Sequence, residues 1–274
     1  MRALRVFSIS VGICVLALCA PVTKAQSPYQ SSADFTKYAQ KLRESALLKM
    51  EPTVQVQTSS RSLFGGRYPW KENIVTTVFW IGEGTTARNP TPNRASSWDP
   101  NWMGNYGGVD NPTRRNGYLP VAFVPGQNPF YCALPYNDVT RGTTKPEASF
   151  VIPWFRQAFQ RPGHSVCKGR WLAIRRGDRV CYAQWEDCGP FRTDHWQYVF
   201  GKDRPKPNLN AGAGLDVSPA VRDFLGINGT KDVCDWKFVE FSEVPPGPWA
   251  RYGDNNDFVI NSRRGTERVA NGKR

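Results

Sequence analysis

The chain has 274 residues, of which 40% are hydrophobic and 22% are charged, and its formal net charge is +13. This apolar content excludes an intrinsically disordered chain, and the 24 glycines and 22 prolines argue against a bundle of long helices. Beyond the first segment no apolar run is long enough to cross a bilayer, so we expect no stable membrane span. The length suits one folded domain with extensions, and we expect a monomer.

The first 25 residues have the pattern of a secretory signal peptide. Arg2 and Arg5 precede an apolar run from Val6 to Ala20, and small residues end the segment at Ala25. Removal of this segment lowers the net charge from +13 to +10. The pattern predicts export to the periplasm, the cell envelope or the extracellular space.

Residues 26–72 are predicted to form an N-terminal helix and a linker. Apolar residues recur at helical spacing between Phe35 and Leu47, and Pro52 ends the pattern. The next segment, residues 73–85, is rich in β-branched and aromatic residues and ends in glycine, which predicts a strand.

Residues 88–120 show no periodicity and form a long loop. The loop contains four large aromatic residues, which are Trp98, Trp102, Tyr106 and Tyr118. We expect these side chains either to cover the folded domain or to stack on sugar rings.

Several further strands and one helix are predicted in the rest of the chain. The strand patterns lie at residues 121–124, 130–134, 170–174, 178–185 and 236–241. A helix over residues 219–225 begins after the N-cap Ser218 and ends at Gly226. The short strands and their turns indicate a small β-barrel or sandwich over residues 73–248. Residues 249–274 lack apolar periodicity and are predicted to be a basic, flexible tail.

Five cysteines follow the predicted signal peptide: Cys132, Cys167, Cys181, Cys188 and Cys234. Export favours disulfide formation. Cys167 and Cys181 bracket a segment with the pattern of two strands around a turn, and we predict that they pair. The chain has no C-x-x-C motif and only two histidines, so the sequence predicts no metal site, and no cofactor motif is present.

The segment from residue 181 to 226 carries the most specific pattern. In CYAQWEDCGPF, a strand runs into a Gly-Pro turn with Asp187 at its end, and GLDVSPAVRDFLG places Asp216 just before the capped helix. This combination resembles the rare lipoprotein A family, whose double-psi β-barrel is shared by expansins and small endoglucanases. The resemblance covers residues 74–245 and implies a mainly β fold, a six-stranded double-psi β-barrel with short helices.

The resemblance also implies a site. In the rare lipoprotein A family the aspartate of this turn, here Asp187, is the catalytic acid of a peptidoglycan lytic transglycosylase, while the endoglucanases would place the acid at Asp216. A carboxyl group held neutral can protonate a glycosidic oxygen. The residues expected to bind substrate are Trp80, Glu83, Tyr131, Trp185 and Phe191, of which Glu83 is also a candidate base. Tyr131 stands where the family has a histidine, and the long loop replaces the family's Gly-rich opening.

Other interpretations remain open. Asp187 can instead accept backbone hydrogen bonds in its turn, and Asp216 can favour the start of the helix. The whole protein can be a non-catalytic, expansin-like module that binds or loosens polysaccharide, or a barrel whose groove binds protein. Export and the scattered basic residues argue against nucleic acid and favour cell-wall or matrix polysaccharide as the partner.

Overall fold

The structure, a computed structural model, describes residues 68–86, 89 and 91–271. The predicted signal peptide and the predicted helix between residues 35 and 47 lie outside the described residues. In the part of the chain that is described, no helix is both long and apolar enough to cross a membrane.

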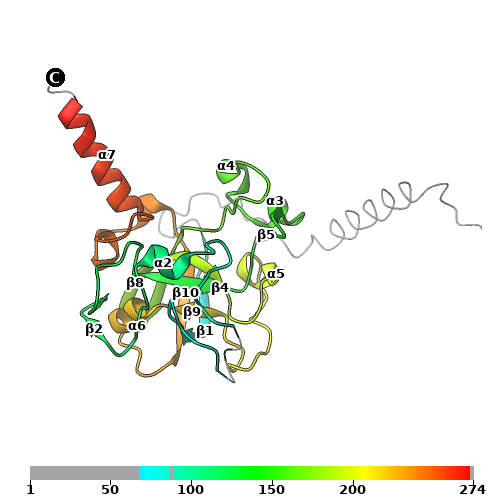
Figure 1. Ribbon diagram of the computed structural model, residues 1–274. Coiled ribbons are helices and arrows are strands. Elements are labelled where there is room, and N and C mark those ends of the chain that lie inside the picture. The colour runs from blue at the N-terminus through cyan, green and yellow to red at the C-terminus, as the bar shows by residue number, and fades with distance from the viewer. Residues whose placement is uncertain (1–67, 87–88, 90, 272–274) are drawn as a thin grey trace, which may run out of the picture. The chain divides into compact units, whose positions relative to one another are not determined.

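Six strands close into a barrel, which confirms the mainly β prediction (Figure 1). In their order around the barrel they are β1 (Lys71–Val78), β10 (Lys231–Phe238), β7 (Arg170–Arg176), β8 (Arg179–Cys188), β4 (Tyr131–Leu134) and β9 (Leu215–Val217). The barrel is mixed, because β1 runs parallel to β9 and β4 runs parallel to β8, while the other neighbours are antiparallel. Most of its strands lie at or close to the predicted segments.

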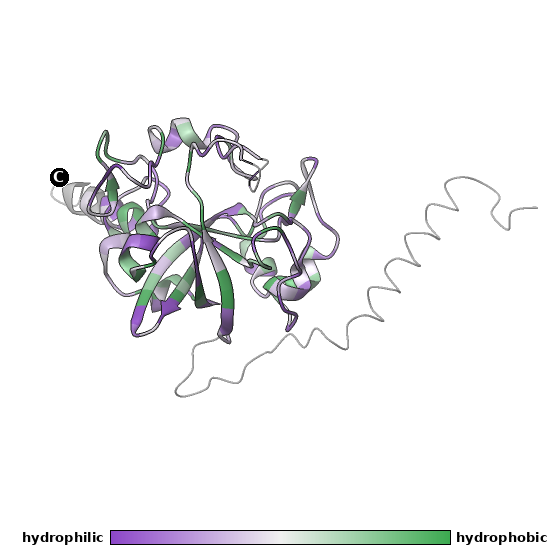
Figure 2. Ribbon diagram, turned by 90° about the horizontal axis from the view of Figure 1, so that it is seen from below, coloured by the Kyte–Doolittle hydropathy of each residue, from purple (hydrophilic) through white to green (hydrophobic). Residues whose placement is uncertain are grey.

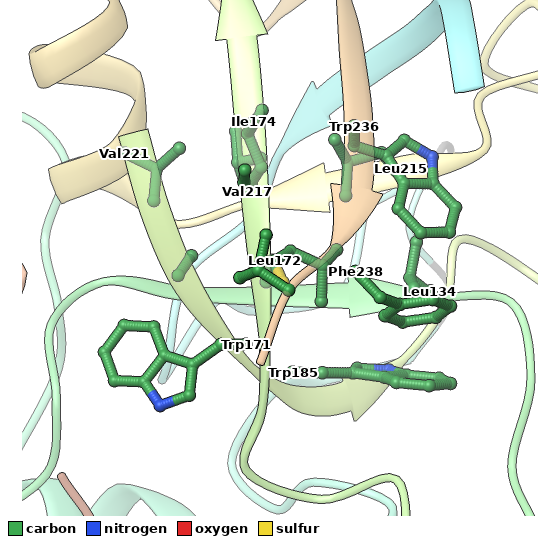
Figure 3. Close-up of a cluster of buried hydrophobic side chains, with 14 of the residues drawn as sticks. Leu134, Trp171, Leu172, Ile174, Trp185, Leu215, Val217, Val221, Trp236 and Phe238 are labelled. Carbon is green, nitrogen blue, oxygen red and sulfur yellow. The ribbon is translucent and has the colours of Figure 1, made fainter. Parts of the chain in front are cut away.

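The barrel interior is filled by large apolar side chains from all sides. Figure 3 shows Leu134, Leu172, Trp185 and Phe238 gathered there, and Figure 2 shows hydrophobic stretches along the barrel strands with hydrophilic residues toward their ends. The Trp185 ring stacks on Phe238 with 5.9 Å between the ring centroids. Burial of such aromatic residues stabilises the barrel by removing large apolar areas from water.

Helix α6 (Pro219–Leu225) confirms the predicted caps. The Ser218 side chain accepts a hydrogen bond from the Val221 backbone N–H, and Gly226 ends the helix with a φ of 68°. The helix follows β9 directly, so its cap and its buried residues fix the end of the strand that carries Asp216.

The remaining elements are short and lie in the connections. They are α2 (Trp102–Tyr106), β2 (Arg115–Asn116), β3 (Leu119–Pro120), β5 (Val139–Thr140), β6 (Thr143–Thr144), α3 (Ala148–Val151), α4 (Phe155–Ala158), α5 (Trp196–Val199), η2 (Phe241–Glu243), η3 (Pro248–Ala250) and α7 (Asp257–Asn271).

Two local predictions differ from the structure. Residues 121–124 are not a strand, and Val121 and Val124 are exposed. The long loop contains α2 and the β2–β3 hairpin, with Trp102 and Tyr106 fully buried. These two aromatic side chains therefore cover the barrel, whereas the other two, Trp98 and Tyr118, are only partly buried.

The segment predicted to be a flexible tail contains regular structure, since η3 ends at Ala250 and α7 spans Asp257–Asn271. Both apolar and polar contacts hold this segment, since Trp249 is buried in the core and the Phe258 ring packs against Trp171. The Asn255 backbone carbonyl accepts a hydrogen bond from Gln184 Nε2 at 2.9 Å, and its Nδ2 donates to Glu186 Oε1 at 3.0 Å. Hydropathy periodicity does not detect anchoring of this kind.

The predicted Cys167–Cys181 disulfide is absent, and all five described cysteines are free thiols. The register of the β7–β8 hairpin explains the error. It pairs Cys181 with Ile174 and Trp185 with Arg170. Cys167, which precedes β7, therefore lies toward the far end of β8 and not opposite Cys181.

Candidate functional site

Four residues form a row across adjacent strands of the barrel. Thr77 of β1 pairs with Asp216 of β9, Asp216 pairs with Ala133 of β4, and Ala133 pairs with Asp187 of β8. Residues at paired positions project from the same face of a sheet. The row therefore places two carboxyl groups on one face, with the small Ala133 side chain between them.

An irregularity in β8 directs Asp187 to this face. Cys132 pairs with Trp185, but the next residue, Ala133, pairs with Asp187, so Glu186 is an extra residue in β8. In a regular strand Trp185 and Asp187 would project to the same side. The β-bulge reverses the alternation, which sends Trp185 into the barrel core and Asp187 to the opposite face.

The row forms the floor of a pocket of about 490 Å³, which we name the carboxyl pocket. Its wall residues include Thr77, Phe79, Glu83, Asn89, Asn93, Ser97, Ala133, Asp187, Gly189, Phe191, Arg192, Thr193, Asn210 and Asp216. The turn after β8 approaches Asp216 closely, since a Cβ placed on Gly189 would lie 3.4 Å from Asp216 Oδ2. Asp187 and Asp216 therefore face one cavity.

Asp187 is held by backbone groups. Its Oδ1 accepts hydrogen bonds from the backbone N–H groups of Ser97 at 2.8 Å and of Cys188 at 2.7 Å. Burial raises the pKa of Asp187 to about 6, although these two hydrogen bonds favour the carboxylate and oppose the rise. Asp187 therefore accepts backbone hydrogen bonds in its turn, as the sequence allowed, and it also lines the carboxyl pocket.

Asp216 is the more strongly perturbed of the two carboxyl groups. Burial, with smaller contributions from the charges of Glu83 and Asp187, raises its pKa to about 7, although the Thr77 hydroxyl donates a hydrogen bond to Oδ1 that opposes the rise. Near neutral pH this carboxyl group is therefore divided between its protonated and its charged form. A group of this kind can give up a proton and take one back.

Glu83 supplies a third carboxyl group to the pocket. Its Oε2 accepts a hydrogen bond from Asn93 Nδ2 at 3.0 Å, and burial raises its pKa above the ordinary value. It stands in the turn after β1, and its charge acts on Asp216. The wall thus combines carboxyl, carboxamide and hydroxyl groups, which suit a ligand that carries many hydroxyl groups.

The structure brings together only part of the predicted site. Asp187, Asp216, Glu83 and Phe191 line the carboxyl pocket. Trp80, Tyr131 and Trp185 do not line it. Trp185 is fully buried in the barrel.

Tyr131, which stands at the position of the family's histidine, is also buried and lies outside the pocket. Its hydroxyl group donates a hydrogen bond to Asp110 Oδ2 at 2.9 Å and accepts one from the Ile81 backbone N–H at 3.0 Å. The Tyr131 hydroxyl group therefore connects the loop region to β4.

Sequence reasoning missed most of the other residues of the pocket, and four polar ones among them are Thr77, Ser97, Asn93 and Asn210. Thr77 had no clear signal, because it follows another threonine, Thr76, which is fully buried on the opposite face of β1. The other three come from irregular loops, whose approach to the barrel has no local sequence signal.

Among the residues that the structure describes, no group of three or more His, Cys, Asp or Glu side chains is placed to hold a metal ion. A comparison of the chain with protein families, with curated proteins and with solved structures finds no match. The function is therefore inferred from the carboxyl pocket.

Proposed function

We propose that the protein is an exported enzyme of the cell envelope that cleaves polysaccharide in the carboxyl pocket. The observation that carries this proposal is the pair Asp187 and Asp216, which flank Ala133 in one cavity and both have raised pKa values. Cleavage of a glycosidic bond requires a neutral acid to protonate the leaving oxygen and a base to accept a proton from the attacking hydroxyl group.

The spacing of the pair suits this chemistry. Asp187 and Asp216 lie two strands apart, and adjacent strands are about 4.8 Å apart, so across the curved barrel wall their backbones are separated by at most about 10 Å. Carboxyl groups about 6.5–9.5 Å apart leave room for a water molecule on the far side of the sugar ring. Ala133 between them leaves the floor of the pocket free of a large side chain.

We assign the acid to Asp216 and the base to Asp187. Asp216 has the higher pKa, about 7, so it retains more of its proton near neutral pH. The two backbone N–H groups that contact Asp187 Oδ1 favour its carboxylate form. Asp216 then protonates the glycosidic oxygen as the bond breaks. Asp187 takes the proton of the attacking group, either a water molecule or a hydroxyl group of the sugar itself.

We further propose that the barrel is of the double-psi type found in the rare lipoprotein A family and in expansins. The mixed, closed six-stranded arrangement supports this assignment, as does the position of Asp187 at the end of β8.

The alternative is a non-catalytic, expansin-like module that binds or loosens polysaccharide. Phe191 favours this alternative, since 41% of this aromatic residue is exposed at the pocket wall. Binding would need the pocket and Phe191 but no proton transfer.

One experiment separates these functions. The exported protein is incubated with purified peptidoglycan and with matrix polysaccharides, and the soluble products are analysed by mass spectrometry. Anhydro-sugar ends indicate a transglycosylase and new reducing ends indicate a hydrolase. Cleavage should be lost in Asp187→Asn and in Asp216→Asn, and retained in Asp178→Asn, which changes an exposed aspartate in the β7–β8 turn. Binding without release of products in the wild type would support the module instead.

A further inference from the structure

A second, shallower depression lies beside the carboxyl pocket. It is lined by Phe191, Arg192, Thr193, Asp194, Pro207, Asn208 and Leu209. The first three of these residues also line the carboxyl pocket. The two hollows therefore adjoin along one short segment of chain, residues 191–193.

Phe191 stands at this boundary in an unusual conformation. Its φ is 58°, which is unfavourable for an aromatic residue, and the Arg192 backbone N–H donates to the Pro190 carbonyl at 2.8 Å across it. The Phe191 side chain is left 41% exposed instead of being buried. Strained residues of this kind persist only where the surrounding structure imposes them, and they cluster at functional sites.

Backbone hydrogen bonds on both sides impose this conformation. The Gly189 N–H donates to the Leu134 carbonyl at 3.0 Å, and the Asn137 N–H donates to the Thr193 carbonyl at 2.9 Å. Both partners belong to β4 or to the segment just after it. The aromatic ring is thus held on a rigid part of the barrel, which is the arrangement that a binding platform requires.

We propose that a pyranose chain runs from the carboxyl pocket across Phe191 into the second depression, with one sugar ring stacked on the Phe191 ring. This inference rests on the proposed function. It limits the substrate to polysaccharide chains that are too long for the carboxyl pocket alone and that bind through sugars in the middle of the chain. The apolar C–H face of a pyranose matches the exposed aromatic ring. Its hydroxyl groups at the ring edge match the polar side chains of Asn208, Asn210 and Arg192 in the walls.

The test measures binding separately from cleavage. Wild type, Phe191→Ala, Phe191→Tyr and the control Phe150→Ala, which removes an exposed phenylalanine of α3, are compared for retention on peptidoglycan sacculi and on a soluble polysaccharide in affinity electrophoresis. Phe191→Ala should lose roughly three- to tenfold in affinity, as expected for the loss of one aromatic contact. Phe191→Tyr should restore it, and Phe150→Ala should match the wild type.

Cleavage of oligosaccharides of increasing length then tests the path. With Phe191→Ala, KM should rise more for long chains than for short ones, and the wild type should cut within chains. The inference is overturned if Phe191→Ala equals Phe150→Ala in retention, if the wild type is not retained, or if it releases only terminal sugars. If retention depends on Phe191 but the wild type cleaves nothing, the binding path across Phe191 is supported and the proposed enzymatic function is contradicted.

Discussion

Asp187 and Asp216 are kept in surroundings that disfavour their charged forms. In the described part of the chain neither carboxyl group has an ion-pair partner, and their hydrogen bonds come from neutral backbone and hydroxyl groups. Two buried acids without a cation cost folding free energy whenever they ionise. Such a cost is typical of a site selected for chemistry and not for stability.

The first prediction is that Asp216→Asn stabilises the protein at alkaline pH. The pKa of Asp216 is raised from 3.8 to about 7 in the folded state. Its contribution to stability is therefore fully present in acid and is lost as the pH rises through about 7. At pH 8 the variant should exceed the wild type by up to about 4 kcal/mol in free energy of unfolding, on the basis of 1.36 kcal/mol per pKa unit.

Urea unfolding at pH 4 and pH 8 measures this difference, with Asp178→Asn as the control at an exposed position. The gain should be confined to the higher pH. A difference between Asp216→Asn and wild type that does not change with pH would show that the raised pKa is absent.

The second prediction concerns the hydroxyl group of Thr77, which donates a hydrogen bond to Asp216 Oδ1. Because this bond favours the carboxylate, Thr77→Val should raise the pKa of Asp216 further. NMR titration of carbon-labelled aspartate measures the pKa directly, and the alkaline limb of any pH–rate profile should move to higher pH.

The matched control for this prediction is Thr76→Val. The Thr76 side chain is also buried on β1, but its hydroxyl group donates to the Ile74 carbonyl at 3.0 Å. An equal effect of both substitutions on the pKa of Asp216 would mean that the hydrogen bond to Thr77 does not act on it.

At the scale of elements, β4 separates the two carboxyl groups. It is hydrogen-bonded to β8 on one side and to β9 on the other, so the distance between Asp187 and Asp216 is set by backbone ladders. Loop movements can change the walls of the pocket without changing this spacing. The floor residue Ala133 therefore controls how much room remains between the two groups.

The third prediction is that Ala133→Val abolishes ligand binding and cleavage by filling this space. Ala183→Val on β8 is the control, since Ala183 is equally buried but lies in the main core. Both variants should lose about 1–3 kcal/mol of stability through overpacking. Thermal unfolding measures the shared loss, and only Ala133→Val should lose activity. Equal activity in the two variants would contradict a site centred on Ala133.

The strands show what local sequence patterns can and cannot predict. The alternation in β8 and the caps of α6 are local signals, and both elements were found where the sequence predicted them. Strand β9 has only three residues and is held by neighbours on both sides, so it carries too little local pattern. The bulge at Glu186 depends on pairing with β4, and for this reason Trp185 was assigned to the site together with Asp187.

At the scale of the whole molecule, the segment that follows η3 is fastened to the barrel by buried amide groups. Asn255 contacts Gln184, Glu186 and Asn128, while Asn256 Nδ2 donates to the Trp249 and Tyr252 carbonyls at 2.8 Å. The contact between Asn128 and Asn255 joins residues that are 127 positions apart in the sequence, so no local pattern predicts it. These amide contacts satisfy polar groups that the barrel buries.

The fourth prediction is that ending the chain after Gly253 destabilises the barrel. Gln184, Glu186 and Asn128 would lose partners, and each buried polar group left unsatisfied costs about 1–3 kcal/mol. Trp171 would also lose its hydrogen bond to Asp257 and its packing against Phe258. Ending the chain after Thr266 retains these contacts and should have a much smaller effect. Urea unfolding of the two truncated proteins measures the difference, and equal stabilities would show that the amide contacts contribute nothing.

The extra residue in β8 has a consequence for how a site of this kind can arise and disappear in evolution. A barrel without Glu186 would have a regular β8, in which the residue after Trp185 pairs with Ala133 and projects to the pocket face. Loss of this single codon would therefore leave the aspartate in the pocket, whereas pairing of Glu186 itself with Ala133 would put Glu186 in the pocket and turn Asp187 toward the core. In alignments with distant barrels, a gap at position 186 should thus be compatible with a retained site, provided that an aspartate follows the residue at the position of Trp185.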